Sequence, residues 1–242
     1  MVHKFEPLKK EPAYLKVYNA VEAEILSGTL PEGAVLQTEA ELCEQFGVTR
    51  ATVREGLRLL EQADLVQRGA AKRFYVKRPD SLDIASSTSR GLALGGVTFR
   101  EIWETLLVLY PQVAHLAAKR MTKDDIARLR NAHEEFDQLR KNDTTEIVEG
   151  AVNFFQHLAG ALDNRVMLAM VQSLNMLIGA SLNKVIGKTP NAQTRISKAQ
   201  ERIIDALEAK NADEAARWIA KHIDDLKRGY KVANMDLEKS VL

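Results

Sequence analysis

The chain contains 242 residues, of which 45% are hydrophobic and 28% are charged, and its formal net charge is +1. This length is enough for two domains, or one large one, with a buried core. The near-neutral charge excludes a protein that coats DNA through overall positive charge, so a nucleic-acid-binding surface must be a local patch.

Cysteine content and targeting signals set two further expectations. The single cysteine, Cys43, excludes an internal disulfide, and its place beside Leu42 in a predicted helix favours a small packed residue over a redox sensor. The sequence shows no signal peptide, lipidation motif or long uncharged apolar run, so we expect a cytoplasmic protein with no membrane association.

Two short amphipathic helices are predicted within residues 37–61, and they meet at Gly47. Thr38 and Glu41 have the spacing of a capping box, and Gly47 tolerates the left-handed conformation that often ends a helix. Thr49 is the expected N-cap of the second helix. The apolar positions at helical spacing on that helix are Val53, Leu57 and Leu60. This arrangement is typical of a helix-turn-helix.

The other face of the second helix carries arginines at four-residue spacing: Arg50, Arg54 and Arg58. Arginine can donate to guanine edges or to phosphates, and the hydroxyls of Thr49 and Thr52 at the helix start can donate to phosphate oxygens. Taken alone, such a stripe is more typical of an ordinary solvated helix face. The preceding capped helix and the hairpin that follows favour DNA binding instead.

A β-hairpin wing is predicted over residues 65–76. Its apolar side chains can face the domain: Val66, Phe74 and Val76. Its basic side chains would approach the DNA backbone or the minor groove: Arg68, Lys72 and Arg73. The predicted DNA-binding residues are therefore Thr38, Thr49, Arg50, Thr52, Arg54, Arg58, Arg68, Lys72 and Arg73.

Residues 14–78 resemble the DNA-binding domain of GntR-type bacterial transcription regulators. The matching segments are Ile25 to Gly33, Thr38-Glu39 with Leu42, Phe46 to Arg50, Val53-Arg54-Glu55, Leu57, Leu60-Glu61 and Leu65-Val66. The resemblance implies a recognition helix that contacts an operator half-site through Thr49, Arg50, Thr52 and Arg54. The chain departs from the family pattern at Ala40, where an arginine often contacts DNA, and at the wing tip, where Ala70-Ala71-Lys72-Arg73 replaces glycines.

Residues 80–97 are rich in serine and glycine and break helical periodicity, so we predict a linker there between domains at 1–79 and 98–242. In the second domain a helix is predicted from Ile102 to Lys119 with a kink at Pro111. Further helices are predicted over 123–141, 145–162, 164–187, 190–209 and 212–233. The predicted fold class is therefore mainly α: an N-terminal winged helix-turn-helix with a small β-hairpin, then an all-helical bundle whose interior can hold a small molecule.

The second domain resembles the FCD effector domain found in the FadR/FCD branch of the same regulators. The resemblance is carried by Leu109-Tyr110-Pro111, Ala117-Ala118, Phe154, Leu158-Ala159, Asn164, Ile203 to Leu207, Ala215-Ala216 and His222-Ile223. Most members hold a divalent metal with one aspartate and three histidines, and the corresponding positions here are Ala151, Phe155, Gln200 and His222. Because a lone imidazole cannot hold a divalent ion at cellular concentrations, we predict no metal and no cofactor. The alternative is a displaced ligand set that includes His157, Glu149 or Glu201.

The same resemblance places an effector pocket at Phe155, Gln200 and His222, although His222 fits a hydrogen-bonded core residue equally well. Leu106 and Tyr110 replace an arginine and a glutamate that the family tends to place on the first helix of the bundle. We therefore expect an apolar effector or a carboxylic acid. Flexible apolar surface for it is offered by residues that also fit a simple core: Phe154, Phe155, Met167, Met170, Met176 and Leu177.

Together these features predict a sequence-specific DNA-binding transcription regulator, in our interpretation a repressor, which binds operator DNA as a homodimer and responds to a small-molecule effector. The alternative is a dimeric DNA-binding protein whose helical domain serves only for association. An enzyme is not expected, because the sequence has no paired nucleophile and base, no glycine-rich phosphate loop and no HExxH-like element.

Overall fold

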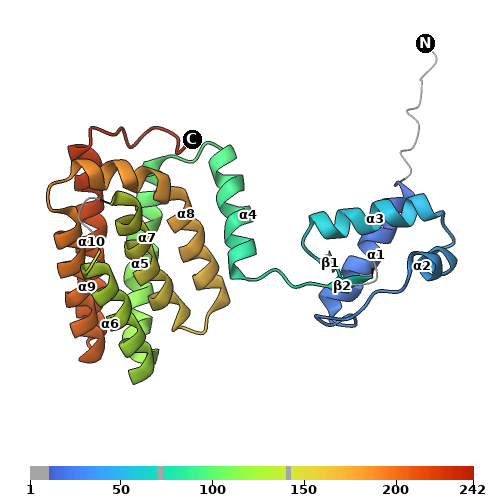
Figure 1. The fold of residues 1–242 in the computed structure, drawn as a ribbon, viewed down its shortest axis with the longest axis horizontal. Coiled ribbons are helices and arrows are strands. Elements are labelled where there is room, and N and C mark those ends of the chain that lie inside the picture. The colour runs from blue at the N-terminus through green and yellow to red at the C-terminus, as the bar shows by residue number, and fades with distance from the viewer. Residues whose placement is uncertain (1–10, 70–72, 140–142) are drawn as a thin grey trace, which may run out of the picture. The chain divides into compact units, whose positions relative to one another are not determined.

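The computed structural model describes residues 11–69, 73–139 and 143–242 (Figure 1). The chain divides into two compact units, Met1–Asp80 and Ser81–Leu242. The described residues are mainly helical, and their strands form a single two-stranded sheet in the first unit. The predicted fold class is confirmed.

The first unit packs three helices against a short hairpin. The helices are α1 (Ala13–Ser27), α2 (Glu39–Phe46) and α3 (Arg50–Gln62), followed by strands β1 (Val66–Arg68) and β2 (Phe74–Val76). The strands are antiparallel, with Val66 opposite Val76 and Arg68 opposite Phe74. Their apolar side chains are buried together with those of the helices, in a core of Val21, Ile25, Leu36, Leu42, Val53, Leu57, Leu60, Val66, Phe74 and Val76. The predicted winged helix-turn-helix is therefore formed.

The ends of α2 and α3 follow the capping signals in the sequence. The Thr38 hydroxyl oxygen accepts a hydrogen bond from the Glu41 backbone N–H at 3.2 Å, and the Thr38 N–H donates to the Glu41 carboxylate at 2.7 Å. Gly47 ends α2 in the left-handed region with φ 62°, and Thr49 caps α3. Each signal acts over three or four residues, so this turn is specified locally.

Helices α1 and α3 approach each other closely at Gly56. A Cβ atom at this position would lie 2.9 Å from Val17 Cγ1 and 3.1 Å from the backbone carbonyl oxygen of Tyr14. The backbone oxygen cannot be moved by a side-chain rotation, so the absence of a side chain at Gly56 allows the packing that orients α3.

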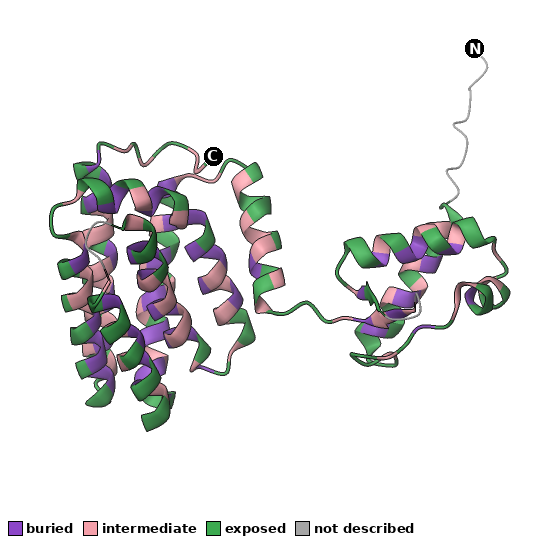
Figure 2. Ribbon diagram, in the orientation of Figure 1, coloured by how far each residue is buried: buried purple, intermediate pink, exposed green. Residues whose placement is uncertain are grey.

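The second unit is a bundle of helices in which the apolar faces turn toward one another (Figure 2). Its helices are α4 (Ser81–Leu94), α5 (Phe99–Arg120), α6 (Lys123–Asp137), α7 (Thr144–Gly160), α8 (Arg165–Lys188), α9 (Ala192–Glu208) and α10 (Ala212–Val232). Side-chain caps begin several of them: Thr98 for α5, Thr122 for α6, Asn164 for α8 and Asn211 for α10. Helix α5 continues through Pro111 without a break.

The predicted linker at 80–97 is wrong for most of its length, because residues 81–94 form α4. Helix α4 packs along α8, where Ala85 is fully buried and its carbonyl oxygen accepts a hydrogen bond from the Ser173 hydroxyl at 3.2 Å. Serine and glycine have modest intrinsic helix propensity, but burial of an apolar face against another helix can override it. The helical unit therefore begins at Ser81, and the direct connection from the first unit is short.

Helix α8 is the longest helix described in the second unit. By length and composition it could cross a membrane, but half of its apolar window is buried inside the bundle. Its buried side chains face α4, α5, α7, α9 and α10. We therefore interpret it as a core helix.

We predict that Gly56→Ala will destabilise the first unit by about 1–3 kcal/mol, because the added methyl group overpacks the α1–α3 contact. Both tryptophans, Trp103 and Trp218, lie in the second unit, so their fluorescence reports on that unit alone. Urea unfolding should therefore show a weakened transition by far-ultraviolet circular dichroism and an unchanged one by tryptophan fluorescence. An unchanged circular dichroism transition would show that α1 and α3 do not pack this closely.

Gly91→Ala is the matched control. Gly91 lies within α4, and no atom is within 4 Å of a Cβ built there. The substitution should stabilise the second unit by about 0.5–1 kcal/mol, because alanine is the better helix former. If this segment were a flexible linker, Gly91→Ala would not raise the stability of the second unit.

Candidate functional site

The basic stripe on α3 is exposed, as the spacing of its arginines indicates. The Arg54 Nε atom donates to the Glu39 carboxylate at 2.7 Å, which ties α3 to α2. The Arg58 guanidinium donates to Glu55 on the same helix, with its Nε atom 2.9 Å from Oε2. Within the described ranges, no hydrogen bond or ion pair engages the Arg50 guanidinium. Arg50 is thus available to another molecule, while the exposed ion pairs of the other two are weak enough to open.

The threonines at the helix starts already have local partners. The Thr49 hydroxyl oxygen accepts from the Thr52 backbone N–H at 3.3 Å and lies 2.9 Å from the Thr52 hydroxyl oxygen. The Thr38 hydroxyl donates to the Glu41 carboxylate at 2.8 Å, and the hydrogen bonds from Thr38 hold the pKa of Glu41 below its usual range. These side chains organise the turn, and contacts from them to DNA remain a prediction.

The three basic residues predicted for the wing differ in their surroundings. The Arg68 guanidinium is exposed and lies over the Phe74 ring, 5.0 Å from its centroid. The Arg73 guanidinium is half-buried and donates to the Leu36 carbonyl oxygen at 2.9 Å. Arg73 therefore fastens the wing to the segment before α2, a role that the sequence did not indicate. Lys72 lies outside the described residues.

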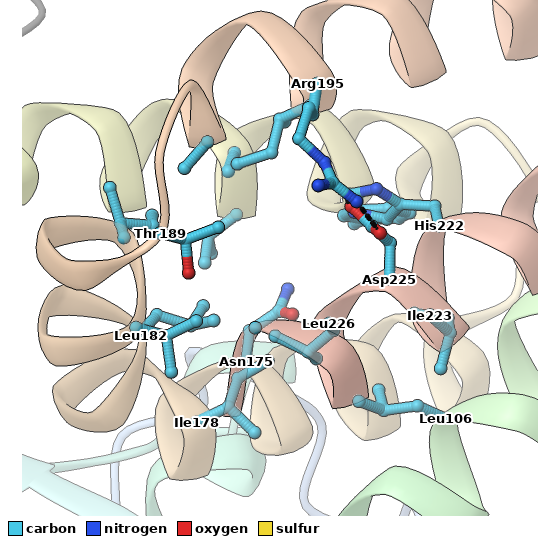
Figure 3. A pocket seen from close by; sticks show the side chains of 18 of the residues that line it. Leu106, Asn175, Ile178, Leu182, Thr189, Arg195, His222, Ile223, Asp225 and Leu226 are labelled. Carbon is cyan, nitrogen blue, oxygen red and sulfur yellow. Dashed lines mark hydrogen bonds and ion pairs between the residues drawn. The ribbon is translucent and has the colours of Figure 1, made fainter. Parts of the chain in front are cut away.

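The second unit contains a cavity of about 80 Å³ among α5, α7, α8, α9 and α10 (Figure 3). Most of its wall is apolar: Leu106, Ala151, Val152, Phe155, Ile178, Leu182, Val185, Ile186, Ala192, Ile196, Ile223 and Leu226. The remaining lining residues are Tyr110, Asn175, Thr189, Arg195, His222, Asp225 and Gly229. Helix α8, the first turns of α9 and the second half of α10 supply much of this surface.

Two of the three predicted effector residues line the cavity. Phe155 and His222 stack with ring centroids 5.4 Å apart and an interplanar angle of 26°. Gln200 does not line it. It is fully buried, and its Oε1 atom lies 3.1 Å from Nδ1 of His133, a residue outside the cavity wall. The expected role of Gln200 is therefore corrected to a hydrogen bond between α9 and α6.

The apolar residues predicted to form the effector surface divide into several places. Phe154 is fully buried beside Phe155 as part of the core, with ring centroids 5.5 Å apart. Three others line a separate, open apolar groove formed by α4, α5 and α8: Met167, Met170 and Leu177. Met176 is 40% exposed. Of the original set, only Phe155 reaches the cavity.

Polar residues that the sequence did not single out complete the cavity. The Arg195 guanidinium forms an ion pair with the Asp225 carboxylate, with Nε 2.9 Å from Oδ2 (Figure 3). The buried Tyr110 hydroxyl donates to the Asn175 Oδ1 atom at 2.6 Å. The asparagine among the buried apolar residues of α8 was the available signal, but its partner lies 65 positions away in the chain.

The residues around the cavity do not fit a divalent metal. Ala151 and Phe155 offer no ligand atom, and Gln200 is bonded to His133, which leaves His222 alone. The His157 Nδ1 atom instead lies 2.9 Å from the carbonyl oxygen of Asn153. In the described part of the chain, no group of three or more histidine, cysteine, aspartate or glutamate residues is placed to hold a metal ion. The absence of a metal remains a prediction.

The His222 imidazole is uncharged at neutral pH. Burial of the ring lowers its pKa to about 4, and the nearby Asp225 carboxylate opposes this shift more weakly. Part of the residue reaches the surface, but the ring, which carries the charge, is packed on Phe155. The cavity wall thus has a neutral histidine at this point.

We predict that the second unit loses stability as the pH falls from about 6.5 to 4. In this range the unfolded chain protonates His222, whose ordinary pKa is 6.5, whereas the folded protein does not. Urea unfolding followed by tryptophan fluorescence should show a loss on the order of 1–3 kcal/mol that is absent in His222→Gln. His157→Gln, the control, should keep the wild-type pH dependence. Equal pH dependence in wild type and His222→Gln would show that the ring is not buried in its neutral form.

Known proteins match both units. Residues 13–76 match the bacterial regulatory proteins of the gntR family, and residues 101–225 match the FCD domain. Similar proteins include the Uxu operon regulator of Haemophilus influenzae, which is 28% identical over 88% of this chain and 80% of its own length. The transcriptional regulator LutR of Bacillus subtilis is 26% identical over 87% of this chain and 99% of its own. The transcriptional repressor NanR of Cronobacter sakazakii is 29% identical over 91% of this chain and 86% of its own length.

A solved structure, Streptococcus agalactiae GntR, has the same fold, with a TM-score of 0.62 and 22% identity over 89% of this chain and 99% of that one. The FCD match alone covers more than half of the 242 residues. The protein therefore belongs to the GntR family of bacterial transcription regulators, in the branch with an FCD effector domain, and is a DNA-binding regulator rather than an enzyme.

Proposed function

We propose that this regulator binds operator DNA as a homodimer in the cytoplasm, represses transcription, and changes its operator affinity when a small molecule fills the cavity of the second unit. The observation that carries the proposal is the presence in one chain of an exposed basic recognition helix and a unit that encloses a largely apolar cavity. We propose repression because the Cronobacter sakazakii relative is named a transcriptional repressor.

Arg50 is the residue best suited to read DNA bases. It is the first residue of α3, and recognition helices contact base edges through their N-terminal part. Its guanidinium is exposed and has no partner among the described residues, so no existing bond must break before it donates to a guanine. Arg54 is held by Glu39 and Arg68 rests on Phe74, positions that suit contacts to phosphates.

A ligand response is favoured over a purely structural role for the second unit. The FCD domain is a ligand-binding effector domain, and the cavity survives here although the family's metal-binding positions hold Ala151, Phe155 and Gln200. A unit used only for association would gain stability by filling such a space. In a homodimer, two α3 helices would occupy half-sites about one helical turn apart, and a ligand that alters their spacing would alter affinity.

We predict that Arg50→Ala will weaken operator binding by about 1–3 kcal/mol at fixed salt, because it removes a base contact. Arg58→Ala should cost less, because Arg58 is engaged by Glu55. The matched control is Arg128→Ala in the second unit, which removes the same charge from an exposed pair with Asp125 and should leave affinity unchanged. Fluorescence anisotropy with an operator selected from random DNA measures all three. Wild-type affinity in Arg50→Ala would remove this residue from the interface.

We further predict that native mass spectrometry of freshly purified protein will show a dimer that carries an organic molecule and no metal. The released molecule, identified after denaturation, should change operator affinity by about 5–150-fold, the usual range of coupling between two sites. A bound divalent metal would contradict the prediction that the cavity holds no metal ion. Operator affinity that the released molecule does not alter would favour the alternative in which the helical unit serves only for association.

A further inference from the structure

The Asn175 side chain places an unpartnered hydrogen-bond donor in the apolar cavity. The residue is 3% exposed, and its Nδ2 atom is buried without a hydrogen bond to any described residue. Figure 3 shows the amide end of this side chain directed into the open space of the cavity. Leaving a buried donor unsatisfied costs about 1–3 kcal/mol, so a ligand that brings an acceptor to this point recovers that free energy.

The orientation of the Asn175 amide follows from its neighbour. Its Oδ1 atom accepts the Tyr110 hydroxyl proton at 2.6 Å, which leaves the NH₂ group facing the cavity as a donor. The reversed amide would place its NH₂ group against the tyrosine oxygen and leave the buried hydroxyl proton without an acceptor. Burial also raises the Tyr110 pKa, so the hydroxyl keeps its proton. The cavity therefore presents an amide donor in a fixed direction.

This donor serves one end of the cavity. Helix α8 and its C-cap border the cavity from Asn175 to Thr189, 14 positions later, which corresponds to about 21 Å of helical rise. The Thr189 hydroxyl also lacks a partner among the described residues, but at this separation it cannot share an acceptor with Asn175. At the Asn175 end the Tyr110 and Phe155 rings lie 4.9 Å apart between centroids. The donor therefore stands alone beside an aromatic wall.

The charges of the cavity argue against an anionic ligand. Among the described lining residues, the ionisable groups are Arg195, Asp225, His222 and Tyr110. The Arg195 guanidinium is paired with Asp225, while His222 and Tyr110 are neutral at pH 7. A carboxylate seated on Asn175 would lose its hydration and find one neutral amide in exchange, which is costly in an apolar site.

We propose that the effector is an uncharged molecule whose single seated acceptor, such as a carbonyl oxygen, binds the Asn175 amide at the end of the cavity formed with Tyr110 and Phe155. This inference rests on the proposed function, which places the effector in this cavity. The volume of about 80 Å³ is roughly half that of a cavity known to hold benzene, so the seated group is small.

Binding of matched probes to the full-length protein tests the inference. Cyclobutanone carries the acceptor, methylenecyclobutane has the same shape without it, and cyclobutanecarboxylate is the anionic counterpart. Because the two neutral probes differ in hydration, the informative quantity is the ratio of their dissociation constants, compared by calorimetry between the wild type and a variant without the donor. Tighter binding of the carboxylate than of cyclobutanone by the wild type would overturn the uncharged class.

The variant without the donor combines Tyr110→Phe with Asn175→Leu. Replacing both partners of the buried hydrogen bond by apolar side chains leaves no hydroxyl unsatisfied, so this variant should fold. Its preference for cyclobutanone over methylenecyclobutane should be about three- to tenfold lower than that of the wild type. The control, Thr189→Val, breaks no protein hydrogen bond of its side chain and should keep the wild-type ratio. An unchanged ratio in the double variant, or an equal fall in Thr189→Val, would overturn the assignment to Asn175.

Vibrational spectroscopy tests the same contact without any variant. The carbonyl stretch of cyclobutanone lies clear of the protein amide bands, and a hydrogen bond to the oxygen lowers its frequency. The band of the bound probe, identified by its growth with protein concentration, should lie below its position in cyclohexane. A frequency equal to that in cyclohexane would show that no donor reaches the carbonyl, and the inference would be wrong.

Operator binding separates this inference from the proposed function. If an acidic metabolite changes operator affinity while the wild type and the double variant have the same probe ratio, the inference fails and the ligand response stands. If cyclobutanone binds through Asn175 but no bound molecule alters operator affinity, the amide site stands and the ligand response fails.

Discussion

The burial of helix α8 is the constraint on which the second unit depends. Eleven of its 24 residues are buried, and five helices pack against it: α4, α5, α7, α9 and α10. Helix α4 has little reason to be helical without that contact. Packing around one long helix also leaves a gap where neighbouring side chains do not meet. The cavity lies there, and α8 contributes both its apolar wall and the Asn175 amide. One element therefore explains the architecture and the site.

The sequence predicts best where the deciding interactions are local. The turn from α2 to α3 depends on Thr38, Glu41, Gly47 and Thr49, all within twelve positions, and its ends were found from these residues. Helix α4 was missed because its stabilising contact is with α8, more than 80 positions later, while its own serines and glycine favour a loop. Local chemistry is readable from a sequence, but the burial of a weak helix former is decided by distant residues.

The residues of the cavity were likewise predicted only in part from the sequence. Phe155 and His222 were identified by resemblance to a family pattern, and they meet in the cavity. Gln200 occupies an equivalent position in the sequence, yet its side chain turns to His133. Asn175, Thr189 and Arg195 line the same cavity but gave no joint signal, because the wall forms only when α8 and α9 are placed in space. Substituted ligand positions can indicate what a site has lost, but they do not show what has replaced it.

Helix α4 is an ordered helix where a flexible tether was expected. Its 14 residues form a rod about 21 Å long that starts at the first residue after the DNA-binding unit and lies against the helix that lines the cavity. A flexible tether would absorb a small displacement of α8, whereas a helix packed along α8 would move with it. A tilt of a few degrees at the cavity would move the far end of α4 by an ångström or more.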